Sequence, residues 1–269
     1  MTTTELLLTA WAPGLAVPLL CVGALGAYAF RVRRLGGGLD GRAVWFALAV
    51  LFFFLALASP IGVLARGYLF SAHMLQHLIL VLAVPPLVLL GLPRETDDPD
   101  QKDESRAGGT RGLALAWLAG VASMWVWHAR PLCNAAATVP AVQWFQTASL
   151  VVMGLAFWRP ILAPRMSDRM PALSAILYLF AACAACTVLG IIVTLSPVEV
   201  CSAYTMPVDT LGAMPLLRGT WGLSCKADQE VGGLLMWVPT CLVYASAILA
   251  SLGRYYVGER PSLTAGGVR

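Results

Sequence analysis

The sequence has little charge and very few histidines. Only 12% of its 269 residues are charged and three are histidine, whereas 59% are hydrophobic and the mean hydropathy is +0.76. A chain this poor in charge is typical of an integral membrane protein and excludes an ordinary water-soluble domain. The net charge of +4 reflects how loops are distributed across the membrane, so it predicts no nucleic-acid partner.

Motifs for covalent catalysis are also missing. No nucleophile-and-base pair, phosphate-binding loop or pair of acids accompanies the histidines. We therefore expect a protein that binds and transfers a ligand and is not an enzyme.

Seven apolar segments are long enough to cross a membrane. A transmembrane helix needs about 20 mostly apolar residues, and charged or turn-rich breaks separate these segments. The sequence predicts an all-α membrane protein in which residues 1–269 form one seven-transmembrane-helix bundle. The predicted spans are Pro13–Phe30, Ala43–Ala58, Tyr68–Gly91, Gly112–His128, Pro140–Leu162, Pro171–Leu195 and Gln229–Leu252.

The distribution of Lys and Arg predicts the orientation. With the N-terminus outside and the C-terminus in the cytoplasm, fourteen of these residues face the cytoplasm and four face outward, as the positive-inside rule requires. Residues 92–111 then form a charged cytoplasmic loop, and residues 196–228 form the longest outer loop. We expect a multi-pass protein of the bacterial plasma (inner) membrane.

Two histidines lie inside the third predicted span. His73 and His77 are four residues apart, so a helix places them on one face with their β-carbons about 6 Å apart. Imidazole is a common ligand for copper, zinc and iron, and polar residues within a membrane span are costly and usually functional. The pair therefore predicts a binding site, although a buried histidine can also serve only as a hydrogen-bonding group.

The third histidine and several methionines are expected at the same membrane depth. His128 ends the fourth span on the outer side, Met124 precedes it by four residues, and Met236 lies about two turns into the seventh span. Imidazole and thioether ligands suit copper, especially Cu(I), better than magnesium or calcium. We predict a metal site formed by His73, His77, His128, Met124 and Met236.

Polar residues near the outer helix ends could support this site. Asp228, Gln143 and Gln229 are candidate hydrogen-bond partners for the histidines, or ordinary contacts between helices. Farther along the third span, Pro85 and Pro86 should kink or break the helix.

The cysteines allow several interpretations. Cys183 and Cys186, in a C-A-A-C pattern, indicate small residues at a helix contact within the membrane. Cys201 and Cys225 could form a disulfide in the outer loop, which would leave Cys133 unpaired. Alternatively, one or more of the outer cysteines could be copper ligands.

Four ordered segments resemble a known family. The strings HMLQHLILVLAVPPLVLLG, WHARPLCNAA, QWFQTASLVVMGLAFWRPIL and DQEVGGLLMWVP are similar to signature blocks of the multi-span bacterial CtaG family of cytochrome c oxidase assembly factors. The resemblance covers about Ser71 to Gly253, excepting the cytoplasmic loop. It implies a seven-span inner-membrane protein that helps to supply copper to the oxidase, with His73, His77 and His128 as its motif histidines.

The fifth-span block departs from the family pattern, which often has further histidines where this chain has Gln143 and Thr147. Because of this departure, Met124, Met236 and the outer cysteines become more important as candidate ligands. The resemblance implies oxidase subunits or another copper chaperone as partners, alongside the lipid bilayer.

Two other functions stay open at this level. His77 and His128 could ligate a b-type haem if their helices pack closely. The chain could also be a metal-free accessory or scaffold subunit for oxidase assembly, with its histidines satisfied by Asp228, Gln143 or backbone carbonyls. A transporter is a weaker option because neither an inverted repeat nor an ATP-binding segment is evident.

Overall fold

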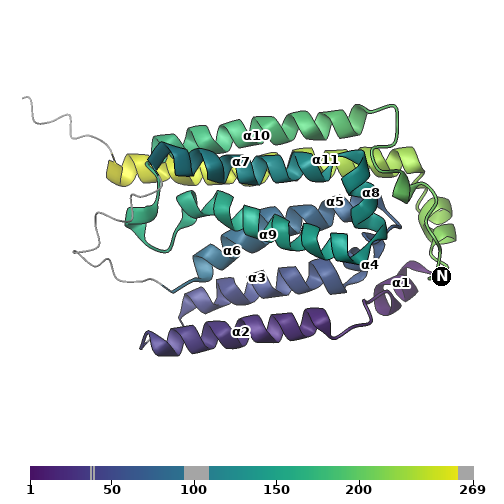
Figure 1. The fold of residues 1–269 in the computed structure, drawn as a ribbon, viewed down its shortest axis with the longest axis horizontal. Helices are drawn as coiled ribbons and strands as arrows, with labels where there is room; N and C mark the ends of the chain where they lie inside the picture. Colours follow the sequence, from purple (N-terminus) through teal and green to yellow (C-terminus); the bar gives the residue numbers. More distant parts are fainter. Residues whose placement is uncertain (37, 39, 94–108, 260–269) are drawn as a thin grey trace, which may run out of the picture.

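The computed structural model describes residues 1–36, 38, 40–93 and 109–259, and this part of the chain is helical, without strands. Figure 1 shows the long helices side by side along one axis. The predicted all-α fold is confirmed. The elements are α1 (Thr3–Thr9), α2 (Ala16–Arg34), α3 (Gly41–Ala58), α4 (Pro60–Leu64), α5 (Phe70–Leu78), the π-helix η1 (Ile79–Ala83), α6 (Val84–Gly91), α7 (Gly109–Trp127), α8 (Arg130–Thr138), α9 (Pro140–Leu162), η3 (Met166–Asp168), α10 (Ala172–Leu195), η4 (Ser202–Tyr204), η5 (Pro215–Thr220), α11 (Cys225–Arg254) and η6 (Tyr255–Glu259).

Six helical segments are long and apolar enough to cross a membrane, or seven if α7 and α8 together form one span. The chain bends by 76° between these two helices. Pro131 lies in the first turn of α8, where its missing N–H is tolerated. Ala129, the residue just before α8, has an extended backbone. The predicted fourth span therefore ends at a sharp corner. The molecule is a multi-pass membrane protein by the length and composition of its helices.

The third span is interrupted near its prolines, as the sequence predicts. The α-helical pattern gives way to the π-helix η1 and resumes in α6, with Pro85 and Pro86 in its first turn. A proline at position 85 cannot donate to the Val81 carbonyl, as a helical residue would. That carbonyl instead accepts a hydrogen bond from the Trp158 indole N–H, at 3.0 Å. The interruption therefore leaves no unpaired carbonyl at Val81.

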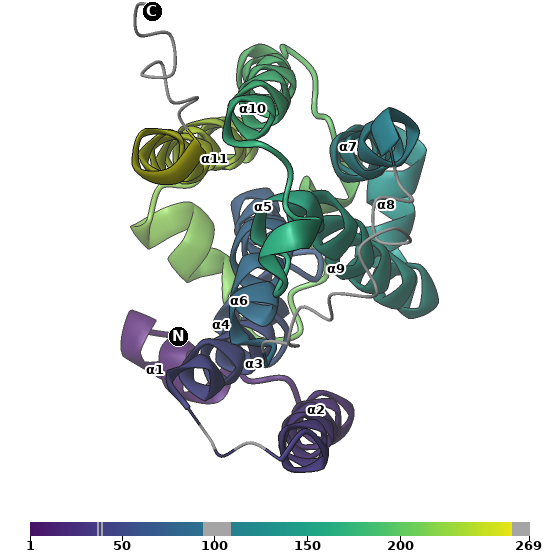
Figure 2. The ribbon, with the colours of Figure 1, turned by 90° about the vertical axis from the view of Figure 1, so that its left-hand side faces the viewer.

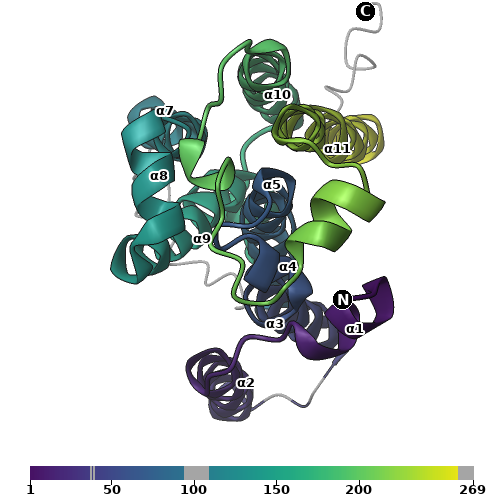
Figure 3. The ribbon, with the colours of Figure 1, turned by 90° about the vertical axis from the view of Figure 1, so that its right-hand side faces the viewer.

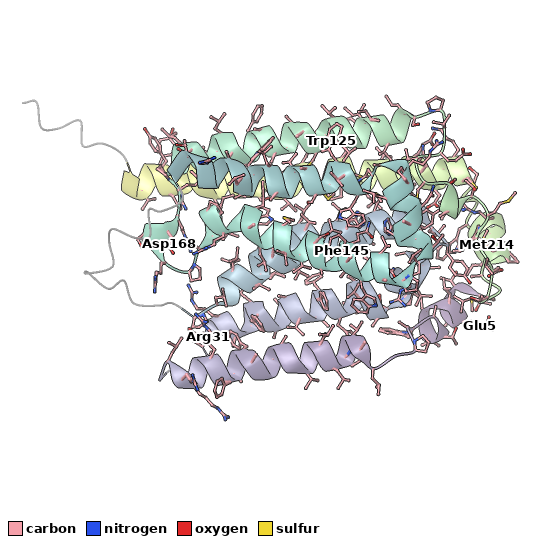
Figure 4. The ribbon with its side chains drawn as sticks, in the orientation of Figure 1. Glu5, Arg31, Trp125, Phe145, Asp168 and Met214 are labelled. Atoms are coloured by element: carbon pink, nitrogen blue, oxygen red, sulfur yellow. A yellow bond between two sulfur atoms is a disulfide. The ribbon has the colours of Figure 1, made fainter. Side chains whose placement is uncertain are left out.

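One end of the bundle, which we call the capped end, is covered by α1, α4, α8 and the segment 196–224 (Figures 1 and 3). In Figure 4, Glu5 and Met214 lie at this end, whereas Arg31 and Asp168 lie at the opposite end. The opposite end also carries the described residues counted as cytoplasmic: Arg31, Arg33, Arg34, Arg42, Arg111, Arg159, Arg165, Arg169 and Arg254. The sidedness of the bundle stays a prediction.

Most of the predicted charged loop, residues 94–108, lies outside the described residues, as do Arg94, Lys102, Arg106, Arg260 and Arg269 of the charge count.

The disulfide at the capped end differs from the expected one. Cys133 of α8 is bonded to Cys201, with their Cα atoms 5.8 Å apart, and Cys225 keeps a free thiol. The expected pairing of Cys201 with Cys225 is therefore wrong. The bend after α7 lays α8 across the capped end, where the Asn134 side chain accepts a hydrogen bond from the Ala203 N–H at 2.9 Å. This contact holds Cys133 beside Cys201.

The histidine-bearing span lies at the centre of the bundle. In Figures 2 and 3, α5 and α6 are surrounded by α3, α9 and α11, whereas α2 lies at the periphery. Phe70–Gly91 is also the most buried of the candidate spans. The fold therefore removes both histidines of α5 from the surface.

Candidate functional site

His73 and His77 form the centre of the site. Both come from α5, and their ring centroids are 4.3 Å apart, as expected for residues one helical turn apart on one face. Their exposed fractions are 0% and 1%. The two imidazoles therefore contact each other in a fully enclosed environment.

His128 reaches the pair from the corner between α7 and α8. Its ring centroid lies 5.7 Å from that of His77, in an edge contact. Its Nδ1 lies 2.5 Å from the Met124 carbonyl oxygen, and its Nε2 lies 3.1 Å from the Met74 sulfur. The structure thus gathers all three histidines of the chain around one buried volume.

The hydrogen bond at Nδ1 determines the tautomer of His128. A carbonyl oxygen can only accept, so Nδ1 must carry the proton, and Nε2 of the neutral ring then bears a lone pair. The Met74 sulfur opposite Nε2 is also a lone-pair donor. Two ligand atoms therefore face each other with no proton between them, which is an arrangement that a soft cation would stabilise.

None of the four ring nitrogens of His73 and His77 has a hydrogen-bond partner. The Ala65 carbonyl lies beside His73 and the Gln146 side chain beside His77. Neither closes a hydrogen bond to the rings, and the Nε2 of Gln146 is also unpartnered. A buried polar group without a partner costs about 1–3 kcal/mol, so these nitrogens favour an additional ligand.

Tyr204 covers this site from the segment 196–224. Its ring centroid lies 5.7 Å from that of His73, and its hydroxyl donates to the Ala65 carbonyl at 2.8 Å. Burial, assisted by the Asp228 carboxylate, raises the pKa of the Tyr204 hydroxyl, so the group stays protonated as a donor. Because the hydroxyl occupies the Ala65 carbonyl, that oxygen is less available to His73.

Asp228 supports the site by holding the start of α5. Its carboxylate accepts hydrogen bonds from the Phe70 N–H at 2.8 Å, the Ser71 N–H at 3.0 Å and the Ser71 hydroxyl at 2.5 Å. Arg218 lies 3.9 Å from the same carboxylate. The predicted partner of the histidines therefore acts on their helix and accepts no hydrogen bond from the rings of His73 and His77.

The two predicted glutamines also lie away from the imidazoles. Gln229 accepts from the Val200 N–H at 2.8 Å and donates to the Val193 carbonyl at 3.2 Å, which ties the end of α10 to α11. Gln143 is half-buried at the start of α9, whereas Gln146, one turn later, is buried beside His77. Gln146 is thus the glutamine that faces the site.

Of the two predicted methionines, Met124 contributes its backbone carbonyl to His128, and its side chain is buried. Met236 is buried in the same apolar core as Met74 and Met124. On α11, a β-carbon at Gly232 would lie 3.1 Å from Met74 Cγ, and Met236 follows one turn later. The thioether in direct contact with a histidine is therefore that of Met74.

The site predicted from the sequence does not include Met74, Gln146 or Tyr204. Met74 follows His73 directly, but helical spacing does not predict its contact with His128, because that contact depends on where the corner after α7 lies relative to α5. Tyr204 carries no local signal, since it belongs to an irregular segment. Within the described ranges, no three or more His, Cys, Asp or Glu side chains are grouped closely enough to hold a metal ion.

A comparison with protein families agrees with the family that the four sequence blocks resemble. No curated protein and no solved structure matches the chain. The family described as cytochrome c oxidase caa3 assembly factor (Caa3_CtaG) matches residues 25–257, which includes every histidine and all of α3 to α11. This match spans well over half of the sequence. The chain belongs to the Caa3_CtaG family of cytochrome c oxidase assembly factors.

Proposed function

We propose that this protein binds Cu(I) at the histidine site and assists copper insertion into a haem-copper cytochrome c oxidase. The observation that carries the proposal is the set of four buried, unpartnered nitrogens on His73 and His77. Membership of an oxidase assembly family indicates the oxidase as the destination of the copper.

The ligand set suits a soft cation. His73 and His77 each offer a ring nitrogen, and His128 offers Nε2 beside the Met74 sulfur. Neutral imidazoles bind a metal without first losing a proton, so the enclosed site is ready to accept an ion. Met236 and Met124 supply further sulfur in the surrounding core. Copper is the cargo in this proposal, so it must also be able to leave.

Copper can enter or leave this buried site only if the groups that cover it move. Because His73 and His77 are fully enclosed, the covering groups must move before copper can pass to a partner. Tyr204 is the group over His73, and it belongs to the segment 196–224 at the capped end. We propose that this end faces outward in a bacterial inner membrane, where a copper chaperone or an oxidase subunit would approach. The excess of Arg at the opposite end supports this orientation.

Elemental analysis of the purified protein tests the proposal. The wild-type chain, purified in mild detergent under reducing conditions, should hold copper at the histidine site, and a His73→Ala, His77→Ala double variant should lose the copper bound at that site. Leu78→Ala is a matched control, because it removes a buried side chain from the same helix without removing a nitrogen. Absence of copper from wild-type protein of copper-replete cells would refute copper binding.

The same samples separate the alternatives. A b-type haem would give an intense visible absorption band that Cu(I) lacks. A metal-free scaffold would associate with oxidase subunits although it contains neither copper nor haem.

A further inference from the structure

Three cysteine thiols gather where α10 packs against α11, about halfway along both helices. Cys183 and Cys186 come from the C-A-A-C pattern of α10, and Cys241 comes from α11. The Cys183 and Cys241 sulfurs are 3.3 Å apart, and the Thr187 hydroxyl lies 3.3 Å from the Cys241 sulfur. Cys186 is buried next to them. The C-A-A-C pattern lies at a helix contact, as expected, and the fold adds a third thiol to it.

This thiol cluster is separate from the histidine site. Cys241 lies five residues beyond Met236 on α11, which corresponds to about 7.5 Å along the helix axis. Since α11 begins at the capped end, the thiols lie deeper in the bundle than Met236. No histidine of the chain belongs to this second cluster.

We propose that Cys183 and Cys241 form a second Cu(I) site. Thiolate sulfur is the softest ligand in proteins and favours Cu(I). Metal–sulfur bonds of about 2.3 Å allow two sulfurs to stand at most about 4.6 Å apart across one ion. The present separation of 3.3 Å lies within this limit, and a linear arrangement would need it to increase by about 1.3 Å.

The charge of such a site can be balanced without another residue. If one thiol proton passes to the ligand that gives up the copper, one thiolate and one thiol around a Cu⁺ ion sum to zero charge, which suits a membrane interior. The Thr187 hydroxyl is placed to donate a hydrogen bond to the Cys241 thiolate. Copper stays in the +1 state throughout, so no oxidant or reductant is required.

Cu(I) titration of the full-length protein in detergent tests this site. Under anaerobic, reducing conditions with a competing chelator, the wild type should bind about two Cu(I) per chain and a Cys183→Ser, Cys241→Ser variant about one. Cys21→Ser is the matched control, because Cys21 is another buried membrane cysteine but lies on α2, away from the cluster. Wild-type copper content in the double cysteine variant would overturn the proposal.

A spectroscopic measurement tests the thiol site even if the cysteine variant misfolds. The His73→Ala, His77→Ala protein keeps all three thiols, so its remaining copper should show sulfur ligands by X-ray absorption. Nitrogen or oxygen ligands alone, or no bound copper, would refute the thiol site. The inference takes only its choice of metal from the proposed function. Loss of copper in the cysteine variant but not in the histidine variant would refute the proposed function and leave the thiol site standing.

Discussion

Replacing Asp228 should destabilise the protein through the helix that carries His73 and His77. The first N–H groups of a helix have no partner within the helix, and those of Phe70 and Ser71 are satisfied only by the Asp228 carboxylate, which is 1% exposed. Asp228→Ala removes this acceptor and leaves both N–H groups buried. It also removes a negative charge from the helix N-terminus, where such a charge is stabilising.

The expected magnitude follows from these contacts. A hydrogen bond to a charged group contributes about 1.5–3 kcal/mol, but contributions to one carboxylate do not add fully. Arg218 keeps hydrogen bonds to the Leu223 and Tyr204 carbonyls, which moderates the loss of its partner. We expect Asp228→Ala to lower the free energy of unfolding by about 3–5 kcal/mol. Asp228→Asn keeps one acceptor oxygen and should cost about 1–3 kcal/mol.

Denaturant unfolding in detergent micelles, followed by far-ultraviolet circular dichroism, measures these differences. Ser71→Ala is the control, because it removes only one of the three hydrogen bonds to the carboxylate and should cost about 1.5–3 kcal/mol. We expect Asp228→Ala to be the most destabilised of the three variants. An Asp228→Ala protein within about 1 kcal/mol of the wild type would refute the capping role. Under the proposed function, folded Asp228→Asn protein should bind as much copper as the wild type, because the carboxylate accepts no hydrogen bond from the rings of His73 and His77.

Three further outcomes are expected. Gly233→Ala should lower the free energy of unfolding by about 1–3 kcal/mol, because the new β-carbon would lie 2.7 Å from a backbone nitrogen of α10. In thermal unfolding, the control Gly253→Ala on the same helix should be neutral or stabilising, because its β-carbon would meet nothing within 4 Å. Cys201→Ser opens a disulfide with a sequence separation of 68 and should cost about 4 kcal/mol; a native mass spectrum showing no disulfide in the wild type would contradict this. Trp158→Phe should cost about 1–3 kcal/mol, because it leaves the Val81 carbonyl unpaired, and an unchanged unfolding midpoint would show that this carbonyl has another partner.

Features that depend on residues close in the chain could be predicted from the sequence. The apolar lengths of the spans, the shared face of His73 and His77 and the interruption near Pro85 all follow from local helix geometry. For the corner after α7, the sequence predicted only that a span ends at His128. The sequence by itself thus determined a helical membrane protein with an imidazole pair inside it.

Features that depend on packing between distant segments were decided only by the tertiary structure. Cys133 pairs with Cys201 because α8 folds across the capped end, and the free energy of closing either disulfide loop changes only slowly with loop length, so sequence spacing does not select the partner. Asp228 caps α5 because of how α11 packs against this central helix, and Met74 faces His128 because the corner after α7 lies beside it. A helix presents a new residue every 100°, so a small rotation exchanges the side chains that meet at a contact. Helical periodicity predicts which residues share a face, but only packing decides what that face meets.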